Sequence, residues 1–154
     1  MIINELGDEK YLGDVLVRSD LNVPMVNNEI SDDIRNSKSL EIIDKIYDFS
    51  RSITFVSHLG RPNGNDLDNS LRPIAENMSK KLKNEKVHFI NSIYGDDVKK
   101  SIKNLTSKIF LLENLRFDEG ELNNDIEFSK LVTSPFETYI FDAFGASHLS
   151  LKHI

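Results

Sequence analysis

The feature that most constrains the fold of this chain is a series of five short apolar runs separated by segments with helical periodicity. Each run has the length of a strand, is rich in β-branched and aromatic residues, and is apolar at consecutive positions. Consecutive apolar positions are typical of strands in a sheet that is covered on both faces. We predict these strands at residues 15–17, 53–56, 87–90, 109–112 and 139–141.

The four segments between the predicted strands carry apolar residues at helical spacing. Pro73 lies in the first turn of the second predicted helix, which follows Ser70, and Asp125 is the expected N-cap of the fourth. The positions expected to face inward or to mark the helical period are Ile34, Leu40, Ile43, Ile46 and Tyr47; Leu71, Ile74, Met78 and Leu82; Val98, Ile102 and Leu105; and Phe128, Leu131 and Val132.

Alternation of strands and helices implies right-handed crossovers between parallel strands, with helices on both faces of the sheet. A chain of 154 residues has the size of one ordinary domain. We therefore expect an α/β fold, namely a Rossmann-like three-layer αβα arrangement with a parallel sheet of about five or more strands, in a single domain over residues 1–154.

Charge and composition exclude several classes of function. The 19 basic and 25 acidic residues give a net charge of −6, which argues against a surface that coats nucleic acid or a polybasic membrane anchor. The absence of cysteine excludes disulfides, thiolate metal sites and cysteine nucleophiles. The chain has no run of about 18 apolar residues and an acidic start unlike a signal peptide, so we predict a cytoplasmic protein. It also lacks metal-binding, dinucleotide and P-loop motifs, so we expect no metal site.

Most of the chemically specialised residues follow directly after a predicted strand. Ligands of open parallel sheets bind beyond the carboxyl ends of the strands, where the loops gather. Arg61 and Arg116 lie in these loops, and Arg35 follows Asp32 and Asp33 at the start of the first predicted helix. Arginine suits bidentate contact with phosphate or carboxylate. Three of the six arginines near one sheet edge therefore favour a site for a small anion.

Each of these residues also has a structural explanation when it is taken alone. A single arginine in a loop is more often a solvated charge than a ligand. His58 can hydrogen-bond its own turn, and Asp20 and Asn22 are residue types that commonly form turns before a proline. Gly60 and Gly145 fit tight turns. The convergence of the arginines, rather than any one of them, carries the prediction of an anion site.

Four strings of the sequence closely resemble phosphoglycerate kinase. They are VLVRSDLNVP at 15–24, SHLGRP at 57–62, LLENLRF at 111–117 and DAFG at 142–145, in the order and at about the spacing of that family. Residues 32–35 and 71–75 extend the resemblance over almost the whole chain. In that family, the N-terminal domain binds 3-phosphoglycerate and the C-terminal domain binds Mg-ATP. The chain resembles only the N-terminal, substrate-binding domain, and we expect the nucleotide-binding domain to be absent from it.

The resemblance implies roles for particular residues. Asp20 and Asn22 would hold the hydroxyl and carboxyl end of 3-phosphoglycerate. His58, Arg61 and Arg116 would belong to the basic patch around its phosphate. The partner of this site would be 3-phosphoglycerate or 1,3-bisphosphoglycerate.

Arg35 would be the catalytic residue, because the resemblance places it nearest to the transferred group. There a guanidinium can neutralise charge on the equatorial oxygens of the transition state. Phosphoryl transfer requires mainly positioning and charge stabilisation from a protein, and no covalent nucleophile. The full enzyme would be a kinase of glycolysis that uses Mg-ATP or Mg-ADP and a carboxyl group as acceptor.

The sequence departs from the family pattern at two places. The family has a His-Arg pair after the DAFG string, but this chain has His148 and Leu149, and a leucine cannot donate to phosphate. Lys152 offers a point charge without the planar fork of arginine. The lysine and glutamate that the family uses for ATP have no positions in these 154 residues. We therefore expect the chain to bind no nucleotide cofactor and to be inactive without the nucleotide domain, supplied in cis or in trans.

Three functions remain open from the sequence. The preferred one is the substrate half of a phosphoglycerate kinase. The second is a stand-alone module that binds a phosphorylated acid without turning it over, and the third is a degenerate homologue that serves as an interaction domain. Retention of the six site residues favours the first two, whereas Leu149 argues against them. Contact with nucleic acid or a membrane is expected for none of the three.

Overall fold

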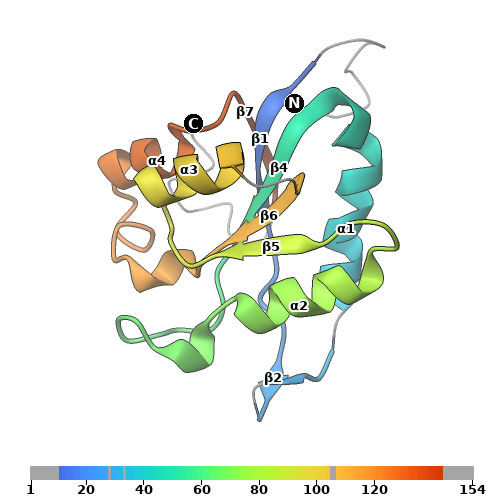
Figure 1. Cartoon of the computed structure of the whole chain (residues 1–154). Helices are drawn as coiled ribbons and strands as arrows, with labels where there is room; N and C mark the ends of the chain where they lie inside the picture. The colour runs from blue at the N-terminus through green and yellow to red at the C-terminus, as the bar shows by residue number, and fades with distance from the viewer. Residues whose placement is uncertain (1–10, 28, 33, 105–106, 144–154) are drawn as a thin grey trace.

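A five-stranded parallel sheet forms the centre of the molecule (Figure 1). The computed structural model describes residues 11–27, 29–32, 34–104 and 107–143. The strand order is β5-β6-β4-β1-β7, and every neighbouring pair is parallel. The strands are β1 (Gly13–Ser19), β4 (Ser50–Val56), β5 (Val87–Ile90), β6 (Ile109–Leu112) and β7 (Thr138–Asp142). All five predicted strands are present, and the expected α/β class is confirmed.

Both faces of the sheet are buried, as the consecutive apolar positions predict. In β1, Val15 and Val17 belong to one hydrophobic core, and Leu16 between them belongs to the other. Successive side chains of a strand point to opposite faces, so that a strand in the centre of a three-layer fold needs apolar residues at every position. Full burial of each such side chain contributes about 1.5–3 kcal/mol.

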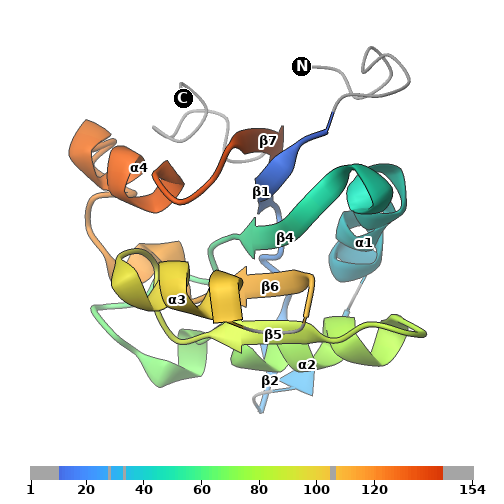
Figure 2. The same ribbon diagram turned by 45° about the horizontal axis from the view of Figure 1, so that its top comes forward.

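Four helices cover the two faces (Figure 2). Helices α1 (Ile34–Ile46) and α2 (Arg72–Lys81) pack on one face, and α3 (Asp96–Asn104) and α4 (Ile126–Thr133) on the other. The side chain of Asp125 accepts hydrogen bonds from the backbone N–H groups of Glu127 and Phe128, which confirms the predicted N-cap of α4. Pro73 lies in the first turn of α2, where its missing N–H costs nothing.

Two apolar positions of the predicted helices are exposed instead of inward. Leu131 of α4 is 49% exposed, so the prediction that it faces the core is wrong. It lies about 100° around the helix from Val132, which is buried with Phe128, and α4 buries only a narrow stripe. Ile34, in the first turn of α1, is 60% exposed. Leu105 lies outside the described residues.

Several short elements were not predicted. Strands β2 (Met25–Val26) and β3 (Glu29–Ile30) form an antiparallel pair, and the described residues also include 3₁₀ turns at η2 (Tyr47–Phe49), η3 (Leu67–Asn69) and η4 (Leu115–Phe117). Elements of two or three residues are too short to leave a periodic pattern in a sequence. Within the described ranges, no helix is long and apolar enough to cross a membrane.

Candidate functional site

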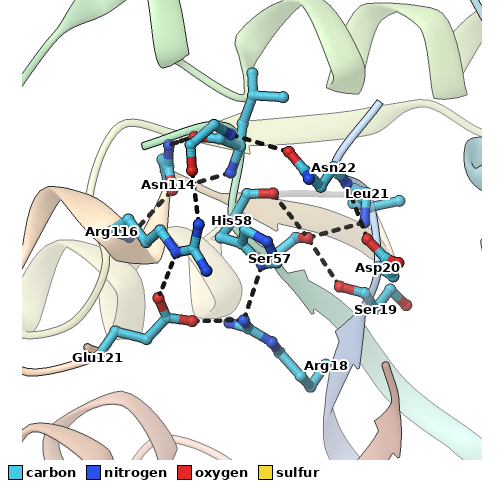
Figure 3. A network of polar contacts seen from close by, with 12 residues as sticks. Arg18, Ser19, Asp20, Leu21, Asn22, Ser57, His58, Asn114, Arg116 and Glu121 are labelled. Atoms are coloured by element: carbon cyan, nitrogen blue, oxygen red, sulfur yellow. Dashed lines mark hydrogen bonds and ion pairs between the residues drawn. The ribbon is translucent and has the colours of Figure 1, made fainter. Parts of the chain in front are cut away.

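The candidate site lies where β1, β4 and β6 end (Figure 3). These strands are neighbours in the sheet and run in the same direction, so the loops that follow them share one edge. Ser57 ties two of these loops together. Its hydroxyl donates to the Ser19 carbonyl at 2.8 Å and accepts from the Leu21 N–H at 2.9 Å. Because Ser57 is fully buried, water does not compete with these bonds.

Asn114 fixes the position of the loop after β4. Its Nδ2 donates to the carbonyls of Leu59 and Asn69, both at 2.8 Å, and its Oδ1 accepts from the backbone N–H groups of Leu59 and Arg116. The side chain is fully buried, so all four contacts replace hydrogen bonds to water. One amide thereby sets the relative position of the two loops that carry His58 and Arg116.

The backbone N–H and carbonyl of Gly60 are both bonded to residues predicted for the site. Its N–H donates to Oδ1 of Asn22 at 2.9 Å, and its carbonyl accepts from Nη1 of Arg116 at 2.7 Å. Gly60 has a φ of +61°, a left-handed conformation that glycine adopts without steric cost. The tight-turn explanation of Gly60 is therefore confirmed, and the same turn connects Asn22 to Arg116.

Arg35 reaches back from the first turn of α1 to the loop after β1. Its Nη1 contacts Oδ1 and Oδ2 of Asp20 at 3.1 and 3.0 Å and the Asn22 carbonyl at 3.0 Å. Asp20 also accepts from the Asn22 N–H at 3.3 Å, so the turn expected from these residue types is present. The Arg35 and Asp20 side chains are 52% and 35% exposed, so solvent weakens their ion pair and the guanidinium remains accessible.

A buried carboxylate joins two arginines beneath this surface. Oε1 of Glu121 accepts from Nη2 of Arg18 at 2.5 Å, and Oε2 accepts from Nε of Arg116 at 3.3 Å. The Glu121 and Arg18 side chains are 0% and 1% exposed, and that of Arg116 is 16% exposed. Removing one partner of a buried ion pair typically costs about 3–5 kcal/mol, because the other charge is left uncompensated.

His58 is a neutral member of this cluster. Its Nδ1 lies 3.2 Å from Nη2 of Arg18. Burial, followed by the positive charges of Arg116 and Arg18, lowers the pKa of His58 to about 4. The imidazole is therefore uncharged near pH 7 in the unliganded protein. It can act there as a hydrogen-bonding group, whereas the arginines supply the positive charge.

The structure brings five of the six predicted site residues into one network: Asp20, Asn22, Arg35, His58 and Arg116. Arg61 follows Gly60 and is exposed, and within the described ranges no hydrogen bond or ion pair connects it to the other five. The positions discussed for the end of the chain, including Gly145, His148, Leu149 and Lys152, lie outside the described residues.

Sequence reasoning did not assign roles to three buried members of the network. Arg18 stands in an apolar strand, where a charged residue between buried neighbours is a signal of a partner. Asn114 stands inside one of the strings that carry the family resemblance. Glu121 lies in a polar loop among exposed residues, and nothing in the sequence distinguishes its carboxylate from its neighbours.

The arrangement can bind an anion but offers no cluster of metal ligands. Arginine donors surround a sheet edge that exposes parts of Arg35 and Arg116. In the part of the chain that the structure describes, no three His, Asp or Glu side chains are grouped so that they could hold a metal ion.

Comparison with known proteins gives one consistent result. Residues 10–152 match the family described as "Phosphoglycerate kinase". The chain is 40% identical over 148 residues to the phosphoglycerate kinase of Dictyoglomus turgidum, covering 95% of this chain and 37% of that protein. It is 40% identical over 135 residues to the phosphoglycerate kinase of a Wolbachia strain from Drosophila simulans, covering 87% and 34%.

Solved structures give the same result for the fold. The phosphoglycerate kinase of Coxiella burnetii superposes with a TM-score of 0.75 at 33% identity, over 96% of this chain and 36% of that chain. That of Pyrococcus horikoshii superposes with a TM-score of 0.77 at 30% identity, over 92% and 36%. The chain thus spans about a third of the length of these relatives.

Proposed function

Because the chain belongs to the phosphoglycerate kinase family, we propose that its sheet edge is the 3-phosphoglycerate site of such an enzyme. The chain corresponds to the N-terminal part of a phosphoglycerate kinase. The full enzyme would transfer a phosphoryl group reversibly between 1,3-bisphosphoglycerate with ADP and 3-phosphoglycerate with ATP. The observation that carries the proposal is the convergence of Arg35, His58 and Arg116 on one edge of an otherwise acidic protein.

Asp20, Asn22 and Arg35 would bind the acid end of the substrate. Oδ1 of Asn22 already accepts from Gly60, which fixes the amide and leaves its Nδ2 as a donor toward the ligand. The contacts of Arg35 with Asp20 and Asn22 all use Nη1, so Nη2 and Nε remain as donors. We propose that Arg35 neutralises charge on the transferred group, as a guanidinium in a fixed position can do at little cost of reorganisation.

His58, Arg61 and Arg116 would surround the phosphate of the substrate. Arg116 is anchored by the Gly60 carbonyl and by Glu121, so its orientation does not have to be fixed when the ligand binds. Arg61 directly follows Gly60 and is exposed, so its side chain is accessible to the phosphate of a ligand. An anion beside His58 would favour the protonated imidazole and oppose the effect of the two arginines.

The nucleotide would be held elsewhere. The described residues offer no cluster of carboxylates that could hold magnesium. We propose that residues 1–154 form one domain with the acid-binding half of the site. Mg-ATP would be held by a part of the enzyme outside these residues. During transfer, the carboxylate oxygen of 3-phosphoglycerate attacks the terminal phosphorus of ATP, the new O–P bond forms, and ADP leaves with the electrons of the broken bond.

Calorimetric titration of the 154-residue chain with 3-phosphoglycerate at low salt tests the proposal. We expect binding that weakens as salt is added, because the cations face solvent. Arg35→Ala, Arg61→Ala and Arg116→Ala should each weaken binding about tenfold, the effect of one charged hydrogen bond. Arg72→Ala is the matched control. It removes the same charge from an arginine that stacks on Phe89 at 4.6 Å, outside the network.

Two results would overturn the proposal. Absence of binding by the unmodified chain would contradict the assignment of the substrate site. Equal losses of affinity for Arg72→Ala and the site variants would show that binding depends only on general charge attraction. A separate assay with 3-phosphoglycerate and Mg-ATP should show no turnover by this chain alone. Turnover at the rate of typical kinases, about 1–100 per second, would contradict the placement of the nucleotide outside it.

A further inference from the structure

We infer that Glu121 is a positioning residue of the anion site, which acts on the ligand only through Arg18 and Arg116. The inference rests on the proposed function, because it concerns the phosphorylated acid that Arg116 and His58, the neighbour of Arg18, would bind. Glu121 is fully buried and so cannot touch a ligand at the surface. Each of its two carboxylate oxygens contacts a different arginine (Figure 3).

The loop that carries Glu121 is built to hold it in place. Asp118 accepts from the Gly120 N–H at 2.8 Å through its side chain, and the Gly120 carbonyl accepts from the Asp125 N–H at 2.9 Å. The Glu121 N–H donates to the Asp118 carbonyl at 3.4 Å, and Asn124 has a φ of +53° where the chain turns into α4. These bonds fix the backbone of Glu121 independently of its side chain. The carboxylate is therefore a fixed point against which the arginines are oriented.

The contacts of Arg116 show what this orientation achieves. Its Nε donates to Glu121 and its Nη1 donates to the Gly60 carbonyl, on different sides of the planar guanidinium. These two contacts fix the plane of the group and leave Nη2 as a donor. Since the Arg116 side chain is 16% exposed, part of it reaches the surface where the anion would bind. Loss of the Glu121 contact would leave Arg116 attached to Gly60 alone and free to rotate.

The charge balance of the cluster also fits an anion site. One buried carboxylate faces two guanidinium groups, and His58 beside them is neutral, so the cluster keeps a net positive charge. A second buried carboxylate would cancel that charge. Without any buried carboxylate, the two guanidinium groups would be buried without a counterion. Glu121 therefore stabilises the pair of arginines without removing their attraction for an anion.

The test compares variants of Glu121 with a variant of a neighbouring glutamate. Glu121→Gln is isosteric but gives one arginine a donor instead of an acceptor. Glu121→Asp keeps the charge but is one methylene too short to reach both arginines. Glu119→Gln is the matched control, because Glu119 lies two residues away, is exposed and loses the same charge. The ligands are 3-phosphoglycerate and inorganic phosphate, titrated by calorimetry, with thermal unfolding measured for each variant.

We expect both Glu121 variants to bind 3-phosphoglycerate about tenfold more weakly than the unmodified chain, because misplaced donors lose contacts that need fixed geometry. The affinity for inorganic phosphate should change by less than about threefold, because phosphate requires no fixed spacing between donors. The ratio of the two affinities should therefore fall for Glu121→Gln and Glu121→Asp. Glu119→Gln should leave it unchanged. A role in stability alone would lower the melting temperature without moving this ratio.

Each outcome decides the inference. If the folded Glu121 variants bind 3-phosphoglycerate as well as the unmodified chain does, the inference is overturned while the proposed function stands. If Glu121→Gln does not fold, Glu121→Asp decides. If neither folds, the role of Glu121 is structural and the inference is overturned. Failure of the unmodified chain to bind 3-phosphoglycerate would overturn the proposed function first, and the inference with it.

Discussion

Nδ1 of His58 lies 3.2 Å from Nη2 of Arg18 in the interior of the site. A guanidinium can only donate hydrogen bonds, so Nδ1 is the acceptor and Nε2 carries the proton of the neutral ring. Burial first, and then the charges of Arg116 and Arg18, lower the pKa of His58 to about 4. Near pH 7 the ring is therefore neutral and accepts a hydrogen bond from Arg18.

The lowered pKa of His58 predicts a pH dependence of stability. In the unfolded chain the imidazole binds a proton near pH 6.5, but in the folded protein it does so only near pH 4. Between these values the unfolded state binds more protons, so the free energy of unfolding should fall as the pH is lowered from 6.5 toward 4. His58→Gln should remove part of this slope between pH 7 and pH 5.

Urea unfolding of the unmodified chain and of His58→Gln at pH 5, 6 and 7 measures this slope. Titration of the His58 ring protons by NMR gives the pKa directly. Identical slopes for the two proteins, or a ring that titrates near pH 6.5, would contradict the prediction.

Gly60 and Gly64 form a matched pair for testing the turn in the site. Both have positive φ, +61° and +68°, but a Cβ on Gly60 would clash with the Asn69 side chain, whereas a Cβ on Gly64 would meet open space. Gly64→Ala should lower the free energy of unfolding by about 1–2 kcal/mol, because alanine is strained in the left-handed backbone conformation. Gly60→Ala should cost about 1–3 kcal/mol more because of the clash, and it should also weaken 3-phosphoglycerate binding through the contacts of Asn22 and Arg116.

Denaturant unfolding and ligand titration of both glycine variants check this expectation. Equal destabilisation by the two alanines would show that Asn69 moves aside without cost. Unchanged binding by Gly60→Ala would show that the peptide of Gly60 does not position the site.

Arg51 contacts two carboxylates of different burial at the opposite end of the sheet. Its Nε donates to Oδ1 of Asp14 at 2.9 Å, and its Nη2 donates to Oε1 of Glu137 at 2.7 Å. Asp14 also accepts from the Ser52 hydroxyl at 2.7 Å, and its side chain is 8% exposed, whereas that of Glu137 is 55% exposed. Asp14→Asn should therefore destabilise by about 1–3 kcal/mol, and Glu137→Gln by less than about 1 kcal/mol.

Chemical unfolding at pH 7 distinguishes the two carboxylates. Neither variant should change the affinity for 3-phosphoglycerate, because the amino ends of the strands are remote from the site. Equal losses of stability for both variants would mean that burial does not determine the strength of these contacts.

Tyr139 carries a buried hydroxyl that has no hydrogen-bond partner in the structure as described. Burial raises the pKa of Tyr139 above the usual value of a phenol, so the group stays neutral. An unsatisfied buried hydroxyl costs about 1–3 kcal/mol. Tyr139→Phe should therefore leave stability unchanged or raise it by about 1 kcal/mol. A lower melting temperature for this variant would show that the hydroxyl does have a partner, ordered water included.

The five-stranded α/β architecture of the described residues could be predicted from the amino-acid sequence, although the short elements β2, β3, η2, η3 and η4 could not. Strands buried on both faces must be apolar at consecutive positions, and helices that cover them must have an apolar stripe. Both patterns can therefore be recognised in the amino-acid sequence. The strings that resemble the family and residues 32–35 likewise depend on local sequence, and the structure brings five residues from them together at one sheet edge, namely Asp20, Asn22, Arg35, His58 and Arg116.

The connections between these residues depend on tertiary packing and could not be predicted from the sequence. Glu121 reaches Arg18 across 103 positions of sequence, and Arg116 reaches the Gly60 carbonyl across 56. The low pKa of His58 depends on its burial and on Arg116 and Arg18, which are distant from it in the sequence. Such contacts depend on distances between segments that periodicity does not encode, because a hydrogen bond requires atoms within about 3 Å. The pattern of residues therefore predicts where the candidate site lies, whereas the packing of the loops determines the charge and geometry of its residues.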